Sequence, residues 1–102
     1  MRRKSTLLSA ATAALALVLL TPTGASASAE GYFYYTTKNK VQYIKDPHVE
    51  ECYKRDADGH TENATNKTAY LYDNTQCHGT PIETMHPGDS EQVQFQAVYF
   101  LR

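Results

Sequence analysis

The run QVQFQAVYFL at residues 92–101 alternates apolar and polar side chains and is the clearest strand of the chain. Successive residues of a strand point to opposite faces, so the glutamines share one face and the apolar side chains share the other. This alternation is typical of a half-buried antiparallel strand. The pattern fails at Val98 and Phe100, which place apolar groups on the glutamine face.

Aromatic and β-branched runs before this stretch predict further short strands at residues 32–37, 41–45, 51–54, 68–73 and 82–85. Polar turn signals separate them. Residues 86–89 read His-Pro-Gly-Asp, with proline and glycine where a type II turn favours them. No window shows helical periodicity. We therefore expect an all-β fold of five or six strands, a small antiparallel β-sandwich or barrel.

One long segment lacks a strand pattern. Residues 55–67 are polar apart from two alanines, and Gly59 together with four Asp or Asn residues supplies turn formers. We expect a long exposed loop here.

The first 29 residues differ in kind from the rest of the chain. A basic start precedes a mostly apolar stretch of fourteen residues at 7–20, and Ala-Ser-Ala-Ser-Ala at 25–29 offers small-x-small cleavage sites. This order is typical of a secretory signal peptide, and the apolar stretch is too short for a membrane span. We expect cleavage after Ala29 and a secreted, extracellular domain of residues 30–102. Its parts are an aromatic segment at 30–45 and a core at 50–102.

Removing the leader changes the charge. Residues 30–102 hold seven Lys or Arg and eleven Asp or Glu, a net charge of −4. An acidic domain argues against nucleic-acid binding and against attack on anionic membranes. Its 73 residues leave little room for a catalytic pocket, and its histidines lack zinc-site spacing. We expect no enzymatic activity, no metal and no cofactor.

The cysteines allow a single intramolecular pairing, because Cys52 and Cys77 are the only two in the chain. An oxidising extracellular environment favours a disulfide between them. In the chain-entropy treatment, closing a loop of this length stabilises the fold by roughly 3.5 kcal/mol. A contribution of that size matters in a domain with a small core.

Residues 69–79 read Ala-Tyr-Leu-Tyr-Asp-Asn-Thr-Gln-Cys-His-Gly and resemble the first hairpin of a βγ-crystallin Greek key. Tyr72 matches the first aromatic and Gly79 the glycine, whereas Cys77 stands in the place of the second aromatic. Residues 51–101 are also similar to small secreted bacterial proteins grouped with crystallin-fold peptidase inhibitors. The resemblance implies a Greek-key β-sandwich and inhibition of a peptidase. The calcium ligands of the family have no full counterpart here.

Consecutive aromatic residues mark a candidate binding surface at Tyr32, Phe33, Tyr34 and Tyr35, and Tyr43 follows in the next predicted strand. Neighbouring strand residues alternate faces, so one pair must leave the core unless both faces are covered. Exposed tyrosine supplies rigid contact area at protein interfaces. We predict partner contacts at these five residues, with the N-terminal segment adding to the sheet edge of another protein.

Two non-catalytic functions remain open. Lys54 and Arg55 suit a trypsin-like protease, and the segment 54–67 would then be the protruding loop of an inhibitor of an extracellular peptidase. The other function is an adaptor or structural subunit that docks on a larger extracellular protein through residues 32–44. In size, leader and cysteine pair the chain is broadly similar to the small adaptors of umbrella-type antibacterial toxin particles.

Overall fold

The computed structural model describes residues 27–102, which form six strands and no helix. The strands are β1 (Gly31–Thr37), β2 (Lys40–Lys45), β3 (Cys52–Thr65), β4 (Ala69–Tyr72), β5 (Glu83–Met85) and β6 (Ser90–Phe100). Every neighbouring pair is antiparallel. The all-β antiparallel class is thus confirmed. Within residues 27–102, no helix is long and apolar enough to cross a membrane.

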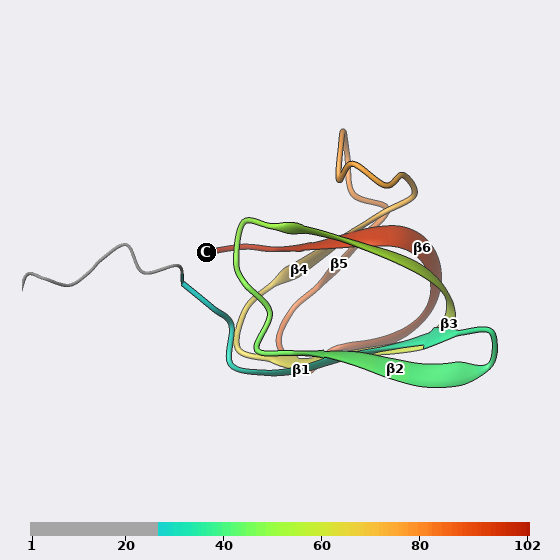
Figure 1. Ribbon diagram of the computed structural model, residues 1–102, viewed down its shortest axis with the longest axis horizontal. Coiled ribbons are helices and arrows are strands. Elements are labelled where there is room, and N and C mark those ends of the chain that lie inside the picture. Colours follow the sequence, from blue (N-terminus) through green and yellow to red (C-terminus); the bar gives the residue numbers. More distant parts are fainter. Residues whose placement is uncertain (1–26) are drawn as a thin grey trace, which may run out of the picture.

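All six strands belong to one sheet, in the order β2-β1-β3-β6-β4-β5. The long strands β3 and β6 curve, so that β1 and β2 lie below β6, β4 and β5 in Figure 1. One continuous curled sheet therefore provides both layers, in place of the two separate sheets of a sandwich.

The core lies inside this curl and centres on Phe33, which is fully buried. Its ring meets Phe95 and Phe100, with centroids 6.2 and 5.3 Å away. Phe95 and Phe100 are an odd number of residues apart and would face opposite sides of a regular strand. The register between β3 and β6 shifts between Lys54 and Ala57, at the level between these two phenylalanines. The extra residue lies in β3, where Arg55 and Asp56 stand against Gln96, so the change of phase in β6 at Val98 is not explained by the register.

The prediction of a loop at residues 55–67 is wrong. These residues belong mainly to β3, which pairs with β1 on one side and with β6 on the other. Alternate residues of its second half point inward, and they are Thr61, Asn63 and Thr65 rather than apolar residues. Inward polar residues on a central strand hide the apolar alternation by which a strand is recognised. Hydrogen bonding inside the protein makes their burial tolerable.

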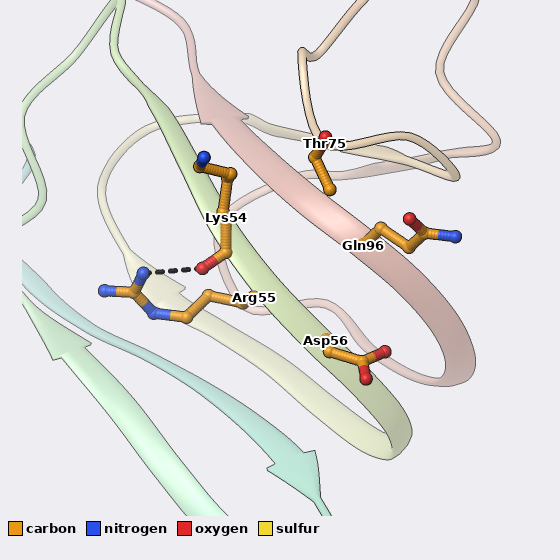
Figure 2. A pocket seen from close by; sticks show the side chains of 5 residues that line it. All are labelled: Lys54, Arg55, Asp56, Thr75 and Gln96. Carbon is orange, nitrogen blue, oxygen red and sulfur yellow. Dashed lines mark hydrogen bonds between the residues drawn. The ribbon is translucent and has the colours of Figure 1, made fainter.

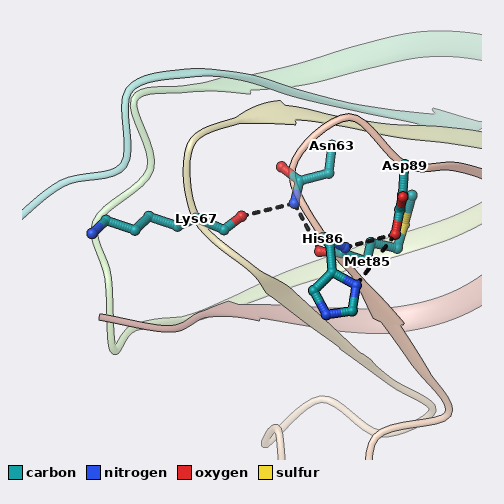
Figure 3. Close-up of polar contacts among 5 residues, drawn as sticks. All are labelled: Asn63, Lys67, Met85, His86 and Asp89. Carbon is teal, nitrogen blue, oxygen red and sulfur yellow. Dashed lines mark hydrogen bonds and ion pairs between the residues drawn. The ribbon is translucent and has the colours of Figure 1, made fainter.

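Asn63 shows how that burial is compensated (Figure 3). Its Nδ2 donates hydrogen bonds to the carbonyl oxygens of Lys67 and Met85 at 2.8 and 2.9 Å. Its Oδ1 accepts hydrogen bonds from the backbone N–H and the hydroxyl of Thr65. Its own backbone N–H donates to Asp89 O at 2.9 Å. One buried side chain thereby ties β3 to the end of β5 and to the turn before β4.

Two turns follow from their residues. Lys38 and Asn39 have φ values of 52° and 65°, both in the left-handed region, as the type I′ turn of a two-residue hairpin between β1 and β2 requires. In the second turn, Asp89 N donates to His86 O at 3.0 Å, and Gly88 has φ 93°. The prediction of a type II turn with Pro87 and Gly88 at its centre is therefore confirmed.

The Cys52–Cys77 disulfide is present, as predicted, with Cα atoms 5.9 Å apart. It ties the first residue of β3 to the segment at 73–82, which connects β4 to β5 and projects from the sheet in Figure 1. Asn74 organises this segment, because its side chain accepts hydrogen bonds from Gln76 N and His78 N and donates one to His78 O.

The predicted signal peptide lies mostly outside the described residues, which begin at Ala27. Ala27, Ser28 and Ala29 are part of the fold. Ala29 is fully buried and donates a backbone hydrogen bond to Pro47 O at 2.7 Å. Val49 N donates to Ala27 O at 3.1 Å. These three residues therefore line the segment that connects β2 to β3.

Candidate protein-binding surface

Three tyrosines gather on the outer face of the β1–β2 hairpin, and we call Tyr32, Tyr34 and Tyr43 the tyrosine cluster. The rings of Tyr32 and Tyr34 stack with centroids 5.7 Å apart and planes at 10°. Tyr43 meets both rings edge-on, at 5.3 Å from Tyr32 and 6.4 Å from Tyr34. Tyr43 is 59% exposed, and the other two are partly exposed. The cluster is thus a preassembled aromatic surface open to solvent.

Strand alternation separates the cluster from its neighbours in the chain. Phe33 is fully buried, and Tyr35 is only 7% exposed. The assignment of partner contacts to Phe33 and Tyr35 is therefore corrected, because these two rings pack in the core against Phe95. The expectation that one of the two aromatic pairs leaves the core is confirmed.

The hairpin is positively charged, although the domain is acidic. Residues 31–45 carry three lysines and no Asp or Glu, whereas residues 46–102 carry ten Asp or Glu against four Lys or Arg. Lys38, Lys40 and Lys45 are all exposed. A ligand that approaches the tyrosine cluster therefore meets positive charge on the β2 side of the rings, whereas Glu62 lies opposite Tyr34 on the β3 side.

The hairpin also holds a free edge of the sheet. β1 has partners on both sides, β2 and β3, so it cannot add to the sheet of another protein. That part of the N-terminal docking prediction is wrong, and β2 is the edge strand instead. Val41 on β2 is 67% exposed and lies opposite Thr36, next to the Tyr43–Tyr34 pair. Sequence reasoning missed Val41, although a short β-branched strand flanked by lysines is typical of an edge.

Lys54 and Arg55 lie elsewhere in the sheet, where β3 pairs with the second half of β6 (Figure 2). The Arg55 Nη1 atom donates a hydrogen bond to Lys54 O at 2.8 Å, and its guanidinium lies 5.4 Å from the centroid of the Tyr53 ring. An open hollow of about 530 Å³ adjoins them, lined also by Asp56, Thr75 and Gln96. Both residues therefore belong to strand β3 rather than to a protruding loop, with Lys54 paired to Ala97 and Arg55 at the register shift.

The remaining titratable groups form exposed pairs, one of which joins distant residues, since Arg102 Nη2 lies 3.1 Å from Glu50 Oε1. Two histidine–carboxylate pairs, His48–Glu51 at 3.4 Å and His86–Asp89 at 3.6 Å, are exposed. Within residues 27–102, no group of three or more His, Cys, Asp or Glu side chains is arranged to hold a metal ion. Burial, with smaller effects of Tyr70 and Tyr99, raises the pKa of the Tyr72 phenol.

Comparisons with protein-family models, with curated proteins and with solved structures find no match to this chain. No relative therefore supports the crystallin-like resemblance. The surface itself must carry any inference about function.

Proposed function

We propose that the protein is a secreted, non-catalytic binding module that docks on a larger extracellular protein through the tyrosine cluster. The observation that carries this proposal is the preassembled arrangement of Tyr32, Tyr34 and Tyr43, open to solvent beside a free sheet edge. Stacked rings lose little conformational entropy on binding, and tyrosine is enriched where interfaces concentrate their energy. A disulfide is compatible with an extracellular location.

An adaptor or structural subunit fits these observations better than a peptidase inhibitor. The inhibitor proposal placed its contact on an exposed loop at 54–67, but residues 52–65 form a central strand. A paired strand cannot enter the cleft of a peptidase without leaving the sheet. The tyrosine cluster requires no such rearrangement.

The test is an affinity purification of the tagged, full-length protein from the culture medium of its producing organism. We expect a larger secreted protein to co-purify in a fixed ratio, quantified by mass spectrometry. The triple variant Tyr32→Ser/Tyr34→Ser/Tyr43→Ser should lose at least nine-tenths of it. A matched control, Gln94→Ser/Gln96→Ser, changes exposed β6 side chains and should retain it.

Thermal unfolding must show that the triple variant is folded, because cross-strand aromatic pairs stabilise a sheet by about 0.2–1 kcal/mol each. Recovery of the monomer alone from the medium contradicts the proposal. Equal recovery of the partner by the folded triple variant contradicts the assigned surface. Inhibition of a secreted peptidase that depends on Lys54 and Arg55 would support the inhibitor function instead.

A further inference from the structure

The edge strand β2 has backbone groups that point away from the sheet. Asp46 N donates to Gly31 O at 2.7 Å, which makes this pair a hydrogen-bonded one. Hydrogen-bonded and non-hydrogen-bonded pairs alternate along an antiparallel ladder. In the register that joins Tyr32 to Lys45 and Tyr34 to Tyr43, the N–H and C=O groups of Val41, Tyr43 and Lys45 therefore face outward.

These outward groups are open to a ligand. Within residues 27–102, no backbone hydrogen bond from a turn or loop reaches Val41, Tyr43 or Lys45. The side chains of the same residues lie on the outer face of the hairpin, where Val41 and Tyr43 are largely exposed. An added strand would thus gain backbone hydrogen bonds along the edge and side-chain contacts beside the tyrosine cluster.

Charge selects the kind of strand that this edge accepts. Three exposed lysines, Lys38, Lys40 and Lys45, lie on the hairpin, and residues 31–45 contain no acid. A second copy that paired through the same edge would bring the lysines of both copies to one junction, and like charges facing each other are destabilising. Lysines on an edge also oppose aggregation of the protein with itself. An acidic strand, in contrast, would neutralise them.

We propose that β2 takes up an extended, acidic segment of the partner protein as an added strand of the sheet, an inference that rests on the proposed function. Backbone hydrogen bonds to Val41, Tyr43 and Lys45 hold the segment. Its apolar residues contact Val41 and the ring of Tyr43 on the outer face, and its carboxylates, on the opposite face, lie on the side of Lys40, which is paired with Thr37. The opposite edge, β5, is only three residues long and begins with Glu83, so it offers neither the length nor the charge.

The probe is a capped nine-residue peptide in which glutamate alternates with valine, and the control peptide carries lysine in place of each glutamate. We expect the glutamate peptide to bind the full chain at least tenfold more tightly in fluorescence anisotropy at low salt. Amide hydrogen exchange should slow at Val41, Tyr43 and Lys45. It should change little at Gln42 and Ile44, whose N–H groups already face β1. Equal binding of the two peptides, no binding, or no slowing of exchange overturns the proposal.

A matched pair of variants tests the backbone contact. Val41→Pro removes an outward N–H without removing a hydrogen bond of the β1–β2 ladder, and Val41→Thr keeps both the N–H and the side-chain shape. We expect at least a tenfold loss of glutamate-peptide affinity in the first and less than a twofold change in the second. Thermal unfolding checks the fold of both. As a second variant, Lys40→Glu/Lys45→Glu should reverse the preference in favour of the lysine peptide.

The same variants separate this inference from the proposed function. If the partner from the culture medium depends on the tyrosine cluster but still binds the folded Val41→Pro protein, strand addition is wrong and the docking function stands. If the unaltered protein captures no partner, the docking function fails, whatever the peptides do. If the Val41→Pro protein no longer captures the partner and the Val41→Thr protein still does, the result supports both strand addition and the docking function.

Discussion

Phe33 and Phe100 meet edge to face in the core, with ring centroids 5.3 Å apart and ring planes at 86°. Phe33 is on β1 and Phe100 is at the end of β6, and these strands are not neighbours in the sheet. Their contact therefore crosses the interior of the curl and joins one layer to the other. Phe33 also contacts Phe95, so its ring packs against two side chains of β6 and holds the two layers together.

The adjacent residues Phe33 and Tyr34 should differ sharply in their effect on stability. Phe33→Ala removes a fully buried ring and should lower the free energy of unfolding by about 3–5 kcal/mol. Tyr34→Ala removes a partly exposed ring and should cost about 1 kcal/mol or less, mainly from its cross-strand contact with Tyr43. Urea denaturation monitored by circular dichroism measures both. Similar midpoints for the two variants would contradict this description of the core.

The disulfide should contribute a large share of the stability of this small domain. In the variant Cys52→Ser/Cys77→Ser, the unfolded chain lacks the cross-link between these two residues, which are 25 positions apart in the sequence. We expect its free energy of unfolding to fall by about 3.5 kcal/mol. Urea denaturation of the oxidised protein, the reduced protein and the double variant measures the effect. The reduced protein should match the double variant. An unchanged midpoint on reduction would refute the prediction.

The strands that were predicted from the sequence are those with a plain alternation of side chains. The glutamines at 92–96 show which face of the last strand is exposed, and the structure agrees, because Phe95 and Ala97 are buried and the glutamines are exposed. The disulfide was predicted from the single possible pairing of two cysteines together with the oxidising environment that the predicted leader implies. The tyrosine cluster was predicted in part. Alternation separated Tyr32 and Tyr34 from Phe33 and Tyr35, but a local pattern does not show which pair is buried.

Other features depend on contacts between distant residues and leave no local signal. β3 resembles a loop in the sequence because its inward residues are polar, and Asn63 among them has a hydrogen-bond partner, Met85 O, that lies 22 residues away. The free edge at β2 follows from the strand order, since β1 pairs with the distant second half of β3. The register shift opposite β6 likewise appears only once its partner strand is known.

Tyr72 should make the stability of the protein sensitive to alkaline pH. Burial raises the pKa of its phenol above the usual value of about 10, because the charged form is poorly solvated there. The stabilising contribution of the neutral phenol is complete below the unfolded-state pKa and is lost as the pH rises through the folded-state pKa. We expect the free energy of unfolding to fall above about pH 10. Tyr72→Phe should weaken this fall. Equal alkaline slopes for Tyr72→Phe and the unaltered protein would contradict the prediction.

Asn63 provides the sharpest test of the buried polar strand, because a partly exposed asparagine in the same chain, Asn74, forms a comparable set of hydrogen bonds. Asn63→Ala removes the donor to the carbonyl oxygens of Lys67 and Met85 and the acceptor for Thr65. Buried groups left without partners cost about 1–3 kcal/mol each, so the free energy of unfolding should fall by about 3 kcal/mol or more.

Asn74→Ala is the matched control, since Asn74 also bonds neighbouring backbone groups but lies in a solvent-accessible loop. Water replaces the hydrogen bonds that Asn74 loses, so this variant should cost about 1 kcal/mol. Asn63→Asp separates donor from acceptor. It keeps an acceptor for Thr65 but turns a carboxylate oxygen toward two carbonyl oxygens, so it should be at least as destabilising as Asn63→Ala. An Asn63→Asp protein that unfolds at the same urea concentration as the unaltered chain would show that the two donated bonds do not hold β3 in place.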